Sequence, residues 1–125
     1  MRFMMIMIPN ISEEDWPEDA EAVAETPEFT AMGKYNDQLI KAGVLLAGDG
    51  LESTAKGARV SFAGGKPSVT DGPFTESKEL IGGYWLIQAR SKEEAVEWAS
   101  RCPANDGDVI EVRQVFEMSD ADKAA

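Results

Sequence analysis

Four consecutive residues, Asp71-Gly72-Pro73-Phe74, place an acid beside two turn-forming residues and an aromatic ring. In a pocket, the Asp71 carboxylate could act as a proton acceptor, provided that burial raises its pKa towards neutrality. The same residue types also make an ordinary turn, in which aspartate accepts hydrogen bonds from backbone amides and Phe74 fills the core. Asp71 is therefore a candidate acid–base residue, with a structural turn as the alternative.

Two later segments offer polar groups to a ligand. Tyr84 lies in the apolar run 82–89 and could present its phenol to a cavity, although a core tyrosine with a bonded hydroxyl is more common. Glu111 and Arg113 alternate with valines, so two charges share a strand face with apolar side chains. Arg113 is a candidate partner for an anionic ligand group. A structural pair with Glu111 is the alternative.

The composition removes several kinds of catalytic site. The chain has 125 residues and no histidine, so it can hold neither a Ser-His-Asp triad nor a histidine-ligated metal. Its one cysteine, Cys102, excludes an internal disulfide and is expected to pack inertly on a helix stripe. The acids of residues 12–25 lack the spacing of a calcium loop. We therefore expect no metal and no cofactor.

The charge balance narrows the choice of partners. Twelve basic against 23 acidic residues give a net charge of -11, which repels nucleic acid and anionic membranes. The apolar run after Arg2 is too short for a signal peptide, and no stretch approaches the roughly 20 apolar residues of a membrane span. We expect a cytoplasmic protein that binds neither nucleic acid nor membrane.

The candidate residues must be positioned by a short series of strands and helices. Thr26-Pro27 opens one helix, and a capping box of Ser91 and Glu94 opens another. In chain order the pattern predicts a strand over 2–8, a helix from Thr26-Pro27 to Gly43, a strand over 44–47, a turn over 48–50, a hairpin over 58–70, a strand over 82–89, a helix over 91–102 and a strand over 109–116. Residues 1–118 form one domain, with an acidic loop or short helix over 12–25 anchored by Trp16, and residues 119–125 form a disordered tail.

The hairpin and the two-sided strands decide the architecture. Gly64-Gly65 suits a tight turn, and Pro67 places the hairpin at a sheet edge. Without the hairpin the order is βαββαβ, an α+β ferredoxin-like sheet with helices on one face. Residues 2–8 and 82–89 are apolar on both faces, so the second face also needs cover. We expect a second copy stacked sheet on sheet, a homodimer; the alternative is a monomer in which the acidic segment and the hairpin cover that face.

The segment DGPFTESKELIGGYW, residues 71–85, resembles the DGPF signature of YCII-related proteins. The opening RFMMIMI, a helix ending in AGV before LLAGDGL, and the closing EVRQV extend the resemblance over residues 2–116. The resemblance implies a dimeric α/β barrel of ferredoxin-like subunits. Some relatives resemble enzymes of small aromatic or chlorinated compounds with a histidine–aspartate pair, of which only Asp71 has a counterpart here. Members of the DGPF branch are often linked with extracytoplasmic-function sigma factors.

The preferred hypothesis is a homodimer that encloses a pocket for a small organic ligand. Gly72, Pro73 and Phe74 would shape its mouth, Tyr84 would add a polar contact, and Arg113 would neutralise an acidic ligand group. One alternative is an enzyme with Asp71 as acid–base residue, and another is a regulatory or accessory protein linked to a sigma factor.

Overall fold

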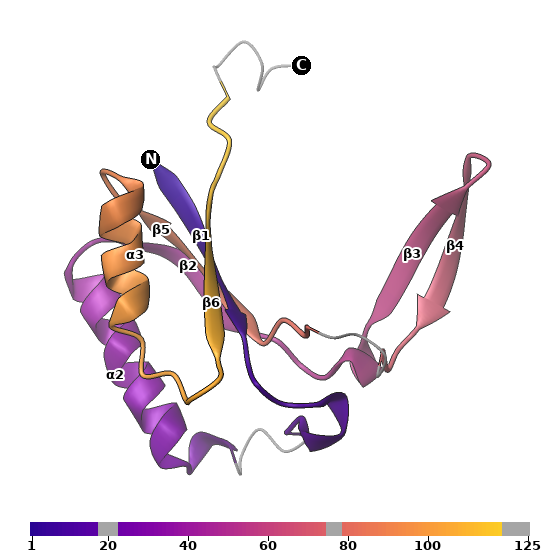
Figure 1. Cartoon of the computed structure of the whole chain (residues 1–125), viewed down its shortest axis with the longest axis horizontal. Coiled ribbons are helices and arrows are strands. Elements are labelled where there is room, and N and C mark those ends of the chain that lie inside the picture. The colour runs from indigo at the N-terminus through magenta and orange to yellow at the C-terminus, as the bar shows by residue number, and fades with distance from the viewer. Residues whose placement is uncertain (18–22, 75–78, 119–125) are drawn as a thin grey trace.

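The computed structural model describes residues 1–17, 23–74 and 79–118. It shows an α+β body, a four-stranded antiparallel sheet in the order β2-β5-β1-β6 with two helices on one face, and a separate two-stranded sheet (Figure 1). The sheet strands are β1 (Arg2–Ile8), β2 (Leu45–Gly50), β5 (Gly83–Gln88) and β6 (Val109–Gln114). The helices are α2 (Pro27–Lys41) and α3 (Lys92–Ser100). The predicted α+β order of elements is confirmed.

Both helices begin where their capping residues indicate. The Thr26 hydroxyl accepts a hydrogen bond from the Phe29 amide at 3.2 Å, and Pro27 occupies the first turn of α2. The Ser91 hydroxyl accepts from the Glu94 amide at 3.1 Å and opens α3. After α2 the chain turns at Gly43, whose φ of 73° suits glycine. Local capping chemistry thus sets the two helices that cover the sheet.

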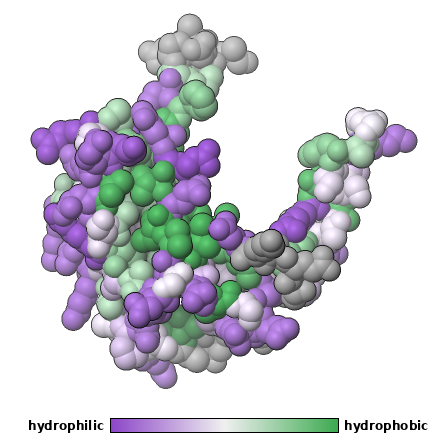
Figure 2. Space-filling view, in the orientation of Figure 1, coloured by the Kyte–Doolittle hydropathy of each residue, from purple (hydrophilic) through white to green (hydrophobic). Residues whose placement is uncertain are grey.

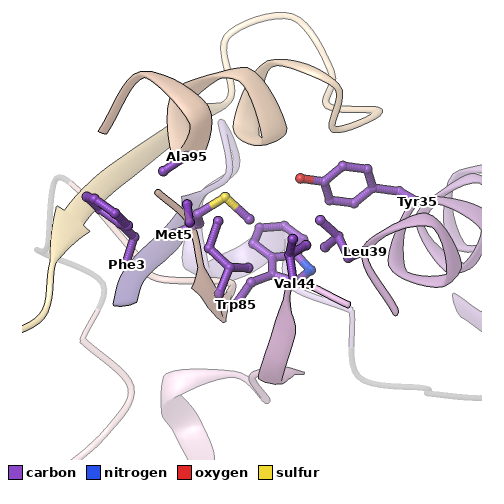
Figure 3. Packing of buried hydrophobic residues seen from close by; sticks show 9 residues of the cluster. Phe3, Met5, Tyr35, Leu39, Val44, Trp85 and Ala95 are labelled. Atoms are coloured by element: carbon purple, nitrogen blue, oxygen red, sulfur yellow. The ribbon is translucent and has the colours of Figure 1, made fainter. Parts of the chain in front are cut away.

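The core lies between the helices and one face of the sheet, and Figure 3 shows how side chains from both layers meet there. Phe3 and Met5 of β1 are buried together with residues of β5 and α2. The rings of Tyr35 and Trp85 pack edge to face, with centroids 5.7 Å apart. The Tyr35 hydroxyl donates a 2.7 Å hydrogen bond to the Trp98 carbonyl, which ties α2 to the end of α3.

The other face of the sheet carries no helix. In β1 the residues alternating with Phe3 and Met5 point to this uncovered face; they are Met4, Ile6 and Ile8 and are only half-buried. The register places Met4 beside Leu86 and Arg113, and Ile6 beside Tyr84 and Glu111. Figure 2 shows hydrophobic side chains gathered on the side of the body away from the helices. We call this surface the open face.

The hairpin does not join the edge of the main sheet, and the prediction that placed it there is wrong. Strands β3 (Ala58–Ala63) and β4 (Lys66–Asp71) pair only with each other and project from the body as an arm (Figure 1). Gly64 and Gly65, with φ of 59° and 78°, make the tip. Every residue of the two strands is exposed, so the arm does not cover the open face of its own chain.

Two further segments differ from the expected boundaries. β2 extends through Gly50, where a turn was predicted, because Asp49 and Gly50 pair with Tyr84 and Gly83 of β5. In the acidic segment a short 3-10 helix, η1 (Glu13–Asp15), precedes Trp16, whose indole N–H lies 3.4 Å from the Leu51 carbonyl oxygen. The expected Trp16 anchor is therefore present. Part of the acidic segment, and the whole predicted tail over 119–125, lie outside the described residues.

Candidate functional site: a cleft beside α2 and the β2–β5 edge

A cleft of about 370 Å³ lies where α2 meets the β2–β5 edge of the sheet. Its walls are mainly apolar: Met32 and Ile40 come from α2, Leu45 from β2, and Trp85 from β5. Three polar residues also line it, Asn36, Asp49 and Tyr84. An apolar hollow with a few polar groups is the usual composition of a small-molecule site.

Glycines let the two strands approach closely beside this cleft. A Cβ added to Gly48 would lie 3.1 Å from the Tyr84 carbonyl oxygen and 3.2 Å from Cδ1 of Trp85. A Cβ added to Gly83 would lie 2.9 Å from the Asp49 carbonyl oxygen, closer than such contacts occur. Gly48 and Gly83 therefore cannot be replaced by larger residues without a shift of the strands, and no side chain from them fills the cleft.

The polar groups of the cleft come from three elements. The Trp85 indole N–H donates a 2.8 Å hydrogen bond to Oδ1 of Asn36, which fixes the amide and leaves its NH2 group as a donor. Asp49 and Tyr84 are partners in the β2–β5 ladder and alternate with Gly48 and Trp85, so their side chains point to the open-face side of the sheet edge that borders the cleft. Within the described part of the chain, Asp49 is the one charged residue of the lining. Because β2 is the edge strand, the Asp49 carboxylate lies at the border of the cleft, and its negative charge favours a cationic group there over an anion.

The segment Asp71-Gly72-Pro73-Phe74 lies at the base of the arm and outside this cleft. A Cβ on Gly72 would overlap the carbonyl group of Thr54, in the 3-10 helix η2 (Thr54–Lys56), so only glycine fits. The Phe74 amide donates a 2.9 Å hydrogen bond to Oγ1 of Thr54. The Asp71 side chain is exposed, and the peptide bond between Gly72 and Pro73 is cis. These contacts fix the base of the arm.

Arg113 lies on the far side of the open face from the cleft. Its guanidinium is 3.3 Å from the Glu111 carboxylate, and both side chains are largely exposed. Strand β1 separates β6 from β5, so Arg113 and Tyr84 share a face without touching the same hollow. The structure therefore distributes the predicted residues over three places: Tyr84 in the cleft, Asp71 to Phe74 at the arm base, and Arg113 on the open face.

Two residues of the cleft were missed as ligand contacts in the sequence. Asn36 falls on the apolar stripe of the helix, between Met32 and Leu39. A polar residue at such a position indicates that its side chain has a polar partner there. Asp49 lies between Gly48 and Gly50, and this sequence predicts a turn. Its role in the lining follows from the pairing of β2 with β5, and no local pattern shows that pairing.

Cys102 follows the end of α3 and packs against the core beside Met32 of α2. Burial raises the pKa of its thiol to about 11, and the Asp108 carboxylate adds to that rise. Its sulfur is 3.9 Å from that of Met32. The neutral thiol therefore packs against the wall of the core. In the described ranges, no three acidic or cysteine side chains converge as metal ligands would, and no helix is long and apolar enough to cross a membrane.

The fold and the cleft define a class of small α+β proteins with a half-covered antiparallel sheet. The YCII-related domain matches residues 1–119, and the chain belongs to this family. An uncharacterised protein of Rhizobium meliloti (strain 1021) is 37% identical over 60 residues, which is 48% of each chain. The chain thus matches about half the length of this curated relative.

Proposed function

We propose that the chain is a small-molecule-binding homodimer whose ligand occupies the cleft beside α2. The observation that carries the proposal is the cleft itself, about 370 Å³ with apolar walls, a fixed amide at Asn36 and the acidic residue Asp49 on the edge strand that borders it. Pockets of this size and lining bury a small organic molecule and orient it with few polar contacts. This site replaces the mouth at Asp71 to Phe74 as the preferred location.

The dimer is proposed from the open face. Met4, Ile6 and Leu86 form an apolar strip that neither helix covers, and the arm of the same chain lies away from it. Stacking two such faces about a two-fold axis would remove both strips from water. The Glu111–Arg113 pair would then lie beside the stacked surfaces.

The lining indicates which ligands should bind best. The wall residues suit an aromatic or aliphatic body, and the Asp49 carboxylate on the edge strand suits an amine that extends to the border of the cleft, because opposite charges attract. A carboxylate placed there would face Asp49 without a counter-charge from the described lining. We therefore expect the order benzylamine, benzyl alcohol, benzoate for three probes of similar size.

Nuclear magnetic resonance titration tests this order directly. Benzylamine should shift the Trp85 indole resonance and the amides of Gly48 and Gly83, because these groups lie in the cleft. The variant Asp49→Asn should weaken benzylamine binding about tenfold and leave benzyl alcohol nearly unchanged. Asp37→Asn, an exposed acid one residue from Asn36 on α2, is the matched control. Shifts confined to other resonances, or equal effects of the two variants, would rule out the cleft as the site.

The catalytic use of Asp71 is a separate proposal. As a proton acceptor, this exposed carboxylate would need a substrate held at the arm base. Asp71→Asn should abolish turnover of any substrate found while the thermal unfolding curve stays in place. A sigma-factor-linked accessory role would instead be supported by a protein partner recovered by pull-down, with binding weakened by salt.

A further inference from the structure

The arm has one apolar face and one polar face. Across its ladder Val60 pairs with Val69 and Phe62 with Pro67, so these four side chains share one face. The alternate pair of Ser61 and Ser68 lies on the opposite face, together with the pair of Arg59 and Thr70. A ribbon patterned in this way normally buries its apolar face.

That apolar face is bare in the single chain. The exposed fractions of Val60, Phe62 and Val69 are 52%, 76% and 67%. An isolated two-stranded hairpin is marginally stable in water, and it needs packing against another surface. Since the arm lies away from its own body (Figure 1), the surface that covers it must come from elsewhere.

The exposed area is large enough for a stable association. The chain exposes 8997 Å², whereas a compact monomer of its mass exposes about 6,600 Å². The bare arm and the uncovered open face both belong to this exposed surface, and a standard interface takes roughly 800 Å² from each partner.

The charges favour another copy of the same chain. Within residues 58–71 the arm carries Arg59 and Lys66 against Asp71, a net charge of +1. The remaining residues therefore hold a charge of -12, given the total of -11. A cationic arm and an acidic body attract each other between copies, and the arm projects on the side where the open face lies (Figure 1).

We propose that the arm is a clasp that closes on a second copy of this chain, with Val60, Phe62, Pro67 and Val69 packed against that copy. The inference rests on the proposed homodimer, which brings a second copy to the open face within the reach of the arm. It adds a contact that stacking of the sheets alone does not supply. Each protomer would then hold the other by its arm.

Photo-crosslinking tests where the arm lies. Phe62 is replaced by p-benzoylphenylalanine in one sample and Ser61 in another, so that neighbouring positions point to opposite faces of the same ribbon. On irradiation, the probe at 62 should give a covalent dimer in much higher yield than the probe at 61. Mass spectrometry of the joined peptides then identifies the surface that the arm contacts. Equal yields at both positions, or products only within one chain, would overturn the clasp.

Sedimentation equilibrium separates this inference from the dimer itself. Phe62→Asp should raise the dimer dissociation constant about tenfold or more, while Ser61→Asp should leave it nearly unchanged. Because Phe62 is exposed in the protomer, near-ultraviolet circular dichroism of the body should be unaffected. If the natural chain is monomeric, the proposed homodimer fails; if it is dimeric and both variants dimerise equally, only the clasp fails.

Discussion

The body and the arm are built from strands of nearly the same length but differ in the contacts that stabilise them. β5 and β3 each have six residues, yet β5 alternates buried and half-buried side chains while β3 is exposed throughout. The body strands have two helices to pack against, whereas the arm strands have only each other. Strand pairing therefore sets the local shape of a segment, and packing against a second layer supplies most of its stability.

The largest effect should come from deleting core volume in the body. Leu39→Ala removes a fully buried side chain of α2 and should lower the free energy of unfolding by about 2–5 kcal/mol. Phe62→Ala removes an aromatic ring from the exposed arm, and it should change the free energy of unfolding of the dissociated protomer only slightly. Urea denaturation below the dimer dissociation constant compares the two. Similar losses would show that the arm packs on its own body.

Gly72, at the junction of arm and body, and Gly33, in α2, differ in the space around them. Gly72→Ala places a Cβ onto the Thr54 carbonyl and should cost about 1–3 kcal/mol, because the arm base has to shift. Gly33→Ala lies in α2 with open space around it and should stabilise by about 0.5–1 kcal/mol. Thermal unfolding measures both. If Gly72→Ala leaves the thermal stability unchanged, the arm base can shift away from the Thr54 carbonyl without a cost in stability.

Thiol alkylation compares access to the body and to the arm. The raised pKa of Cys102 keeps its thiol protonated at pH 8, and the thiolate is the reactive form. Iodoacetamide should modify it about a hundredfold more slowly than an unperturbed cysteine. The variant Ser61→Cys in a Cys102→Ala background should react at the ordinary rate in the protomer, since Ser61 is exposed. Equal rates would show that the body opens as readily as the arm.

Much of the body could be predicted because its signals are local. The Thr26 and Ser91 caps and the continuous apolar run after Arg2 in residues 2–8 define the helices and the sheet strand without tertiary information. The arm could not be placed in this way, since a hairpin has the same residue pattern whether or not it joins a larger sheet. Asp49 was missed for a related reason. The flanking residues Gly48 and Gly50 predict a turn from the sequence, whereas their pairing with β5 makes them part of a strand. Pairing over long sequence distances decides both cases.

The smallest effect is expected on the open face, at the exposed pair of Arg113 and Glu111. Arg113→Gln should change the free energy of protomer unfolding by less than about 0.5 kcal/mol, because exposed ion pairs contribute little. Its effect on association should be measurable, since the pair lies beside Met4 and Ile6 in the proposed stacked face. Arg101→Gln, whose guanidinium pairs with Glu97 at the end of α3 and away from the sheet, is the matched exposed control. If sedimentation shows equal dimer affinity for both variants and the natural chain, β6 lies outside the contact, and the arm would carry more of the association than the stacked sheets.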